Sequence, residues 1–415
     1  MSLSYGRDHV AIPGPSVIPD RVLRAMHRPA PNIYEGDLID LSDTIYRDLP
    51  RLAGTEGNAV IYIGNGHAAW EAAIANMFAP GDTALVLSTG RFALGWAEMA
   101  RRLGVEIETL DFGFRAAFDP AKVSAHLSAD KAHKIRAILT VQTDTASSAM
   151  NDLAALRRAI DAADHPALLM VDSIASFACE PMEMDKWGVD VLVAGCQKGL
   201  MTPPGIAFNF VGPRAWAERR PCASTYWDWA SRIEPEWHYQ RFCGTSPTHH
   251  LYGLREALDM IDEEGLPNTL LRHERLARAV WVAVESWGQA GGIELNIAAP
   301  AERSRAVTTL RSDPGDAAKL RAWCEETTGL VLGLGLPAPN VPRGSLFRIG
   351  HMGHLNAPML LGALATIEAG LGSLGIPHAP GGAQAALQTL STAPAEDLRI
   401  AETREKMSGA RAATV

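Results

Sequence analysis

One lysine of this 415-residue chain lies in a sequence context that predicts a partly buried, reactive amine rather than a solvated surface charge. Lys198 follows the short apolar run 191–194 and precedes a turn rich in glycine and proline that ends at Gly205. Because this turn cannot continue a helix, the lysine is expected at a strand end among small residues. Burial disfavours the ammonium form and frees the amine as a nucleophile for Schiff-base chemistry with a carbonyl. The alternative for this stretch by itself is a plain loop lysine.

An aspartate occupies the matching place one strand earlier. The apolar run 167–171 predicts a buried parallel strand, and Asp172 follows at its carboxyl end. Ligands of open α/β sheets bind outside those ends, where an acid can serve a ribose, a metal ion or a protonated ring nitrogen. Together with Lys198, the acid suits pyridoxal phosphate, since the lysine holds the aldehyde and the acid keeps the ring an electron sink.

The two stretches resemble a known family. Asp172-Ser-Ile-Ala-Ser176, Gly195-Cys-Gln-Lys-Gly199 and Pro203-Pro-Gly205 are similar to the class V (fold type I) aminotransferases. The similarity is strongest to the alanine–, serine– and aspartate–glyoxylate aminotransferase branch and extends from Pro13 to about Gly372. It implies an α/β fold, the pyridoxal-phosphate-dependent transferase fold type I. A large domain with a mostly parallel sheet flanked by helices is then followed by a smaller α+β C-terminal domain.

The resemblance also assigns cofactor contacts. The phosphate-binding turn falls on Asn65, Gly66 and His67, between an expected strand and helix. Unpaired backbone N–H groups and the helix dipole favour an anion at such a turn. Phe92 takes the place of the aromatic residue that stacks on the pyridine ring, and Thr145 that of a hydroxyl that contacts the cofactor. A surface histidine and a core phenylalanine are the plain alternatives. The other expected contacts are Asp172, Ile174, Gln197 and Lys198.

Substrate binding is expected from three further residues. Arg348 alternates with apolar residues in an expected strand, and its planar fork suits a carboxylate, although an exposed charge would show the same pattern. The resemblance places Gly14 near the substrate carboxylate. Tyr34, followed by Glu35, departs from the basic or polar residue that relatives often carry, so this position bears on substrate choice.

The resemblance further implies a homodimer with shared active sites, in which Thr245 reaches the phosphate of the neighbouring subunit. Phe242 replaces a tyrosine of the same segment and loses its phenol hydrogen bond. Ser148 replaces a glycine that usually follows the cofactor loop, which puts the geometry of that loop in question. The aromatic stretch 226–242 is expected at a subunit interface or active-site wall, because no basic patch beside it supports nucleic-acid binding.

The elements that must position these residues alternate between strands and helices. This order predicts a largely parallel sheet with right-handed crossovers. The expected parts of the chain are an N-terminal arm (1–20), a large cofactor-binding domain (21–269), a small C-terminal domain (270–385) and a tail (386–415). Expected strands are 59–63, 84–87, 105–110, 136–141, 206–211, 293–297 and 307–310, and expected helices are 92–103, 120–127, 152–163, 251–264, 271–287 and 317–327.

Composition limits the partners. With 47% hydrophobic and 20% charged residues and a net charge of −9, the chain is typical of a globular protein that binds neither nucleic acid nor an anionic membrane. No apolar run approaches the roughly 20 residues that span a bilayer. Residues 1–9 lack the apolar core of a signal peptide, and the last residues are no peroxisomal address, so a cytoplasmic location is expected. Five scattered cysteines predict reduced thiols rather than disulfides or a metal site.

These features predict a pyridoxal-phosphate-dependent transaminase working by ping-pong transfer. The expected donor is a small amino acid (alanine, serine or aspartate) and the acceptor a 2-oxo acid, which the resemblance suggests is glyoxylate. Donors such as ureidoglycine or pyridoxamine are alternatives. A lyase or desulfurase of the same class is another, although those enzymes place a histidine where Gln197 precedes the lysine. A protein that binds a ligand without turnover is a third alternative.

Overall fold

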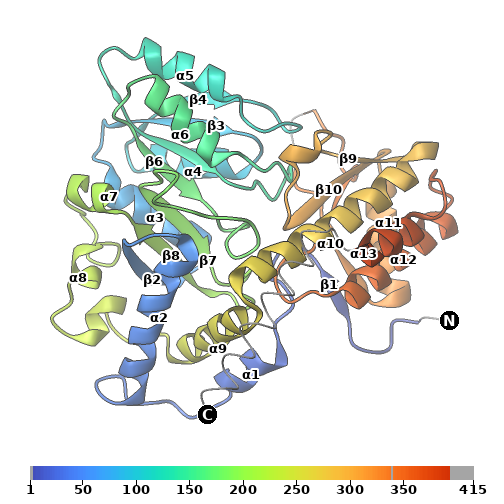
Figure 1. Ribbon diagram of the computed structural model, residues 1–415, viewed down its shortest axis with the longest axis horizontal. Coiled ribbons are helices and arrows are strands. Elements are labelled where there is room, and N and C mark those ends of the chain that lie inside the picture. The colour runs from blue at the N-terminus through green and yellow to red at the C-terminus, as the bar shows by residue number, and fades with distance from the viewer. Residues whose placement is uncertain (1–2, 338–339, 393–415) are drawn as a thin grey trace.

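The computed structural model describes residues 3–337 and 340–392, which form two lobes, each built on one sheet (Figure 1). The strands of the larger lobe lie on the left of this view, and those of the smaller lobe lie on the right. The long helix α10 (Leu266–Trp287) runs from the larger lobe along the smaller one. No helix in the described ranges combines the length and the apolar character that crossing a bilayer requires.

The larger sheet has seven strands within the described residues, in the order β2-β8-β7-β6-β5-β3-β4. The five strands from β7 to β4 in this order are parallel to one another, and β8 runs antiparallel to both β2 and β7. This arrangement confirms the expected mostly parallel sheet. The strands are β2 (Asn58–Gly64), β3 (Thr83–Ser88), β4 (Glu106–Asp111), β5 (Ile135–Val141), β6 (Leu168–Asp172), β7 (Val191–Gly195) and β8 (Gly205–Val211).

Alternating side chains of the central strands form two separate cores, one on each face of this sheet. On β6, Leu168 and Met170 pack in one core, whereas Leu169 and Val171 pack in the other. The first core includes residues of α3 (Gly66–Met77) and α4 (Phe92–Arg102). The second includes residues of α2 (Asp37–Ala53), α5 (Pro120–Ala129), α6 (Leu153–Ala162) and α9 (Thr248–Glu264). Helices on both faces explain why these strands are apolar throughout.

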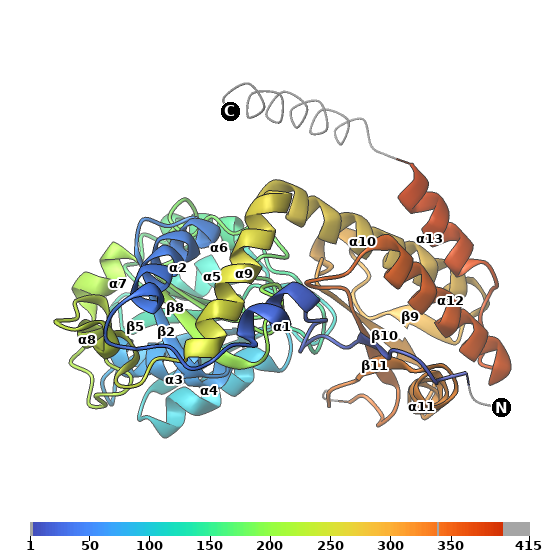
Figure 2. The ribbon, with the colours of Figure 1, turned by 90° about the horizontal axis from the view of Figure 1, so that it is seen from below.

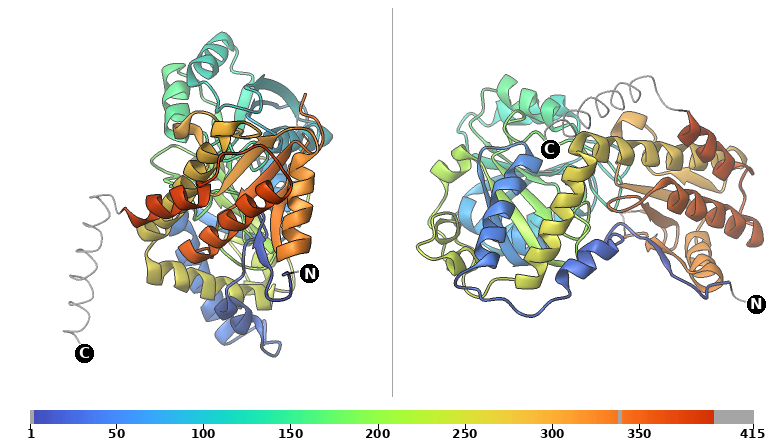
Figure 3. Two further views of the ribbon diagram at one scale, coloured as in Figure 1. Left: turned by 90° about the vertical axis from the view of Figure 1, so that its right-hand side faces the viewer. Right: turned by 60° about the horizontal axis from the view of Figure 1, so that its bottom comes forward.

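The smaller sheet, as far as the structure describes it, has five strands in the order β1-β11-β12-β10-β9. Its core is shared with α10 and with helices that follow it in the chain (Figure 3). The strands are β1 (His9–Ala11), β9 (Ile293–Leu295), β10 (Val307–Ser312), β11 (Leu330–Leu334) and β12 (Leu346–Gly350). The further helices are α11 (Asp316–Thr328), α12 (Ala357–Ser373) and α13 (Gly382–Ser391).

The N-terminal segment belongs to both lobes. Strand β1 pairs in parallel with β11, and the chain then crosses to α1 (Asp20–Met26), which packs against α9 (Figure 2). At the crossing, the backbone N–H of Ser16 donates to the carbonyl of Gln197 (2.9 Å). The hydroxyl of Ser16 donates to the carbonyl of Lys198 (2.7 Å). The arm is therefore fastened to the turn that carries the lysine.

Several elements differ from the expectation. Helix α10 begins at Leu266 rather than 271, because Pro267 is accommodated in its first turn. Helix α13 crosses residue 386, where the tail was expected to start, and the rest of that tail from 393 lies outside the described residues. The division into domains stays a prediction.

Candidate active site

A cavity of about 180 Å³ lies where β5, β6 and β7 end. The residues that follow these strands meet there, because neighbouring parallel strands bring their carboxyl ends to the same edge of the sheet. The cavity brings together every expected cofactor contact except Thr245. Its lining consists of Asn65, Gly66, His67, Trp70, Phe92, Thr143, Thr145, Asp172, Ile174, Ala175, Gln197 and Lys198.

Lys198 points into this cavity, and its Nζ donates a hydrogen bond to the carbonyl of Pro13. Burial and, to a smaller extent, the nearby guanidinium of Arg348 lower the pKa of Lys198 to about 8, although the Asp172 carboxylate opposes them. Gly14 passes so close that a β-carbon there would overlap the lysine side chain, and its φ of +96° also favours glycine. The amine is thus held in place and is readily deprotonated near neutral pH.

Asp172 is 5% exposed and accepts two hydrogen bonds. Its Oδ1 accepts from the backbone N–H of Ile174 (2.6 Å), and its Oδ2 accepts from the indole Nε1 of Trp70 (3.1 Å). Burial raises the pKa of Asp172 to about 7, although these donors and Lys198 favour the charged form. A carboxyl group with this pKa is readily made anionic by a cation placed beside it.

The turn before α3 offers an anion site. The side chain of Asn65 caps the helix by accepting from the backbone N–H of His67 (3.1 Å). A β-carbon on Gly66 would overlap Ile174, so glycine permits the close approach of the backbone to the cavity. Burial lowers the pKa of His67, so that a neutral imidazole is favoured there at neutral pH. The remaining first-turn N–H groups and the helix dipole suit a phosphate.

Asp144 was missed in the sequence and proves central to the cavity wall. Its buried carboxylate accepts from the backbone N–H of Phe92 (2.7 Å) and from that of Ala146 (2.8 Å). It therefore fixes the start of α4, which carries Phe92, and the turn that carries Thr145. The sequence offered a signal for this role, because an aspartate in a loop commonly accepts a hydrogen bond from the backbone N–H two residues later, as in an Asx turn.

Ser148, which replaces a glycine of the resembled family, has a backbone conformation typical of glycine. It adopts φ +61°, in the left-handed region that glycine populates without strain. Its hydroxyl accepts from the backbone N–H of Thr309 in β10 (3.0 Å). This contact with the smaller sheet helps to stabilise a backbone conformation that is costly for serine.

Arg348 lies beside the cavity without lining it. Its Nη1 donates to the carbonyl of Thr145 (2.9 Å) and its Nε to that of Leu334 (2.7 Å). Burial lowers the pKa of Arg348 to about 10, which leaves it a cation at neutral pH. Within one chain the structure does not bring Tyr34 or Thr245 to the cavity: Tyr34 is 72% exposed beside Tyr239, and Thr245 is also exposed.

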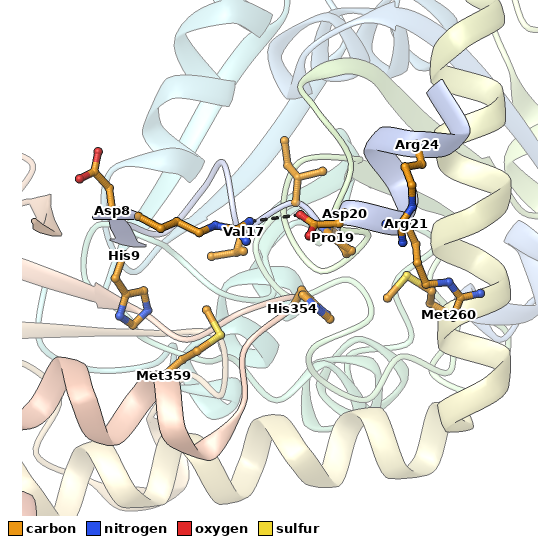
Figure 4. A pocket seen from close by; sticks show the side chains of 12 residues that line it. Asp8, His9, Val17, Pro19, Asp20, Arg21, Arg24, Met260, His354 and Met359 are labelled. Atoms are coloured by element: carbon orange, nitrogen blue, oxygen red, sulfur yellow. Dashed lines mark hydrogen bonds and ion pairs between the residues drawn. The ribbon is translucent and has the colours of Figure 1, made fainter. Parts of the chain in front are cut away.

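A larger hollow of about 530 Å³ lies elsewhere, between the N-terminal arm and helices α9 and α12 (Figure 4). Two of its arginines pair with acids: Arg7 with Asp20 (3.3 Å), and Arg21 with Glu256 (2.7 Å). Its described lining contains no lysine and so lacks the nucleophile of the smaller cavity.

The smaller cavity fits pyridoxal phosphate by its donor set. The helix N-terminus suits the phosphate, Asp172 suits a protonated ring nitrogen, and Lys198 suits the aldehyde. In addition, the buried Oε1 of Gln197 has no hydrogen-bond partner in the described structure, so it is free to accept from a ligand.

Comparison with known proteins agrees with this site. Residues 36–336 match the family described as Aminotransferase class-V. The chain is 37% identical to the serine–glyoxylate aminotransferase of Methylorubrum extorquens, over 92% of this chain and 95% of that protein. It is 33% identical to the L-aspartate–glyoxylate aminotransferase of Paracoccus denitrificans, over 91% and 95% respectively. The crystal structure of pyridoxamine–pyruvate aminotransferase from Mesorhizobium loti superposes with a TM-score of 0.85 at 25% identity, covering 94% of this chain and 99% of that one.

The chain therefore belongs to the class-V aminotransferases. It is a pyridoxal-phosphate-dependent aminotransferase with the fold expected from its sequence. The roles of the individual cavity residues stay predictions.

The pKa of Lys198 gives a test of the cavity electrostatics. In cofactor-free protein, the rate of acylation at Lys198, mapped by mass spectrometry, should reach half its plateau near pH 8, well below that of lysine in a reference peptide. Arg348→Gln removes a neighbouring cation and should move the midpoint to higher pH. Asp172→Asn removes a neighbouring anion and should move it to lower pH. Midpoints that coincide in all three proteins would contradict the electrostatic coupling.

Proposed function

We propose that this enzyme transfers the amino group of a small neutral amino acid, serine or alanine, to glyoxylate by a ping-pong reaction. The observation that carries the proposal is the buried Lys198 amine, which lies in one cavity with Asp172 and interacts electrostatically with Arg348. Relatives named as serine–, alanine– and aspartate–glyoxylate aminotransferases support glyoxylate as the acceptor.

Pyridoxal phosphate supplies an aldehyde for the amine and a ring that withdraws electrons. Lys198 would hold the cofactor through its amine and would take the proton from the Cα of the donor. The pKa of Lys198, lowered to about 8, suits a base that must gain and lose a proton near neutral pH. Asp172 would supply a negative charge to the ring nitrogen. Arg348 binds the substrate carboxylate with its planar fork, with Gly14 at the same end of the site.

A neutral donor is favoured by the charges around the cavity. Among the described residues that line it, Lys198 is the only lysine or arginine. The side-chain carboxylate of aspartate would need a second cation, and Arg343 is exposed on a loop. Aspartate is therefore the alternative donor, followed by ureidoglycine and pyridoxamine. A desulfurase activity is disfavoured because Gln197 precedes the lysine.

A donor screen tests this function. Serine, alanine, aspartate, cysteine and pyridoxamine are each offered with glyoxylate and with pyruvate, and the new amino acid and keto acid are quantified. We expect kcat/KM for serine or alanine with glyoxylate to exceed that for aspartate about tenfold or more, because an unpaired buried charge is costly. Lys198→Ala should abolish transfer, and Arg348→Gln should raise KM. Sulfide release from cysteine, or transfer by Lys198→Ala, would contradict the proposal.

We further propose that the enzyme is a homodimer in which Thr245 binds the phosphate held by the partner's Asn65–His67 turn. Thr245 is exposed and lies near a surface rich in aromatic residues, including Tyr239 and the 60%-exposed Trp237. Such residues are enriched in interface cores. Phe242, which is buried, cannot supply the hydrogen bond that a tyrosine would.

Thr245→Val tests the shared site, because it removes a hydroxyl while keeping the side-chain shape. We expect the variant to bind pyridoxal phosphate about tenfold more weakly, by loss of a hydrogen bond to a charged group. Dilution to monomer should abolish activity. Thr109→Val, at an exposed position of β4, is the matched control and should bind normally. A fully active monomer, or an unchanged affinity in Thr245→Val, would rule out the shared site.

A cytoplasmic location is also proposed. All five cysteines are free thiols in the structure, three of them buried, which suits a reducing compartment.

A further inference from the structure

Trp70 is more than a core residue of α3. Its helical spacing suits packing, and its side chain is 1% exposed within the core between α3, α4 and the sheet. Yet its indole Nε1–H points at the Oδ2 of Asp172, 3.1 Å away, across 102 residues of sequence. A ring of similar size without the N–H would fill the same space and leave that oxygen without this donor.

The two oxygens of Asp172 are held by different parts of the chain. Oδ1 accepts from the backbone of Ile174, two residues away, which constrains one end of the carboxylate locally. Oδ2 is held by Trp70, so the indole fixes the rotation of the carboxylate about its Cβ–Cγ bond. Each carboxylate oxygen can accept more than one hydrogen bond, so a third donor from the cavity can still be accommodated.

Trp70 is itself fixed by the walls of the cavity. Its ring contacts those of His67 (centroids 4.6 Å apart), Phe92 (6.3 Å) and Trp96 (6.0 Å, stacked). The indole therefore connects the phosphate turn, the aromatic wall and the acid. Its position is thus constrained by packing as well as by the hydrogen bond to Asp172.

We propose that Trp70 is a positioning residue, whose indole N–H holds the Asp172 carboxylate anionic and oriented toward the ring nitrogen of the cofactor. The proposal rests on the role given to Asp172 in the proposed function. Asp144 and Lys198 are the other charged groups that act on Asp172, the first disfavouring and the second favouring its anion. Without the indole N–H, Lys198 and the Ile174 N–H would be left to oppose both burial and Asp144.

The test compares two ligands of the cofactor-free protein. One is pyridoxal phosphate, and the other is its analogue with carbon in place of the ring nitrogen. Both carry the aldehyde and the phosphate, so the ratio of their dissociation constants isolates the contribution of the ring nitrogen. The natural protein should prefer pyridoxal phosphate. In Trp70→Phe we expect this preference to fall about tenfold, the effect of one lost hydrogen bond to a charged group.

Trp96→Phe is the matched control. It removes an indole from the same stack, but its Nε1 faces the backbone carbonyl of Trp70 (3.4 Å) and not the acid. We expect a comparable loss of thermal stability with an unchanged preference. An equal fall in preference for both variants would show that packing alone matters and would overturn the proposal.

Asp172→Asn separates this inference from the proposed function. If this variant keeps the preference for pyridoxal phosphate, Asp172 does not face the ring nitrogen, and both ideas fail. If it loses the preference while Trp70→Phe keeps it, only the role of Trp70 is refuted. Should Trp70→Phe fail to fold, benzothienylalanine at position 70 keeps the shape and lacks the N–H donor. If that protein prefers pyridoxal phosphate over the analogue as strongly as the natural protein does, the proposal is likewise overturned.

Discussion

Lys198 and Asp172 lie together in a sheltered cavity at the carboxyl ends of neighbouring strands, and the charge of each shifts the pKa of the other. Burial pushes both groups toward their neutral forms, which brings their pKa values to about 8 and about 7. A buried pair of this kind is costly unless every partner is in place. The surrounding structure supplies those partners: the N-terminal arm presents the carbonyl of Pro13 to Lys198, and α3 presents the indole N–H of Trp70 to Asp172.

The two lobes meet at the cavity through polar contacts. Arg348 from the smaller sheet donates to the carbonyl of Thr145, and Ser148 accepts from Thr309. Behind them, the buried Glu180 accepts from the hydroxyls of Thr143 (2.7 Å) and Ser304 (2.8 Å). Such networks are strong only when fully satisfied. The position of Arg348 relative to Lys198 therefore depends on how precisely the lobes pack.

The sequence predicted those parts of the site that depend on strand ends. Asp172 and Lys198 follow apolar runs, and parallel strands must bring such residues to the same edge. The turn before α3 was recognisable for a similar reason. The elements that were not predicted, such as α2, α12 and β11, contain no residues that resemble a catalytic or cofactor-binding motif. Strand β1 was not predicted either, because three residues carry too little periodicity, and its pairing with β11 is a long-range contact.

Side-chain direction was the other limit. Trp70 has the spacing of a core residue, and nothing local shows that its N–H meets Asp172. Asp144 lies beside Thr145 in the sequence, yet its bond to Phe92 spans 52 residues. The sequence alone left the conformation of the Ser148 loop in question, because it could not show that the Ser148 hydroxyl accepts a hydrogen bond from Thr309. In each case the function of the side chain depends on a residue that only the folded chain brings near.

The central claim is that Lys198, alone among the lysines, carries the cofactor. Borohydride reduction of the cofactor-loaded protein, followed by digestion and mass spectrometry, tests it directly. The account predicts one pyridoxyl label per chain, on the peptide that contains Lys198, and no label in cofactor-loaded Lys198→Ala. A label on Lys122, Lys186 or any other lysine, or no label on the natural protein, would contradict it.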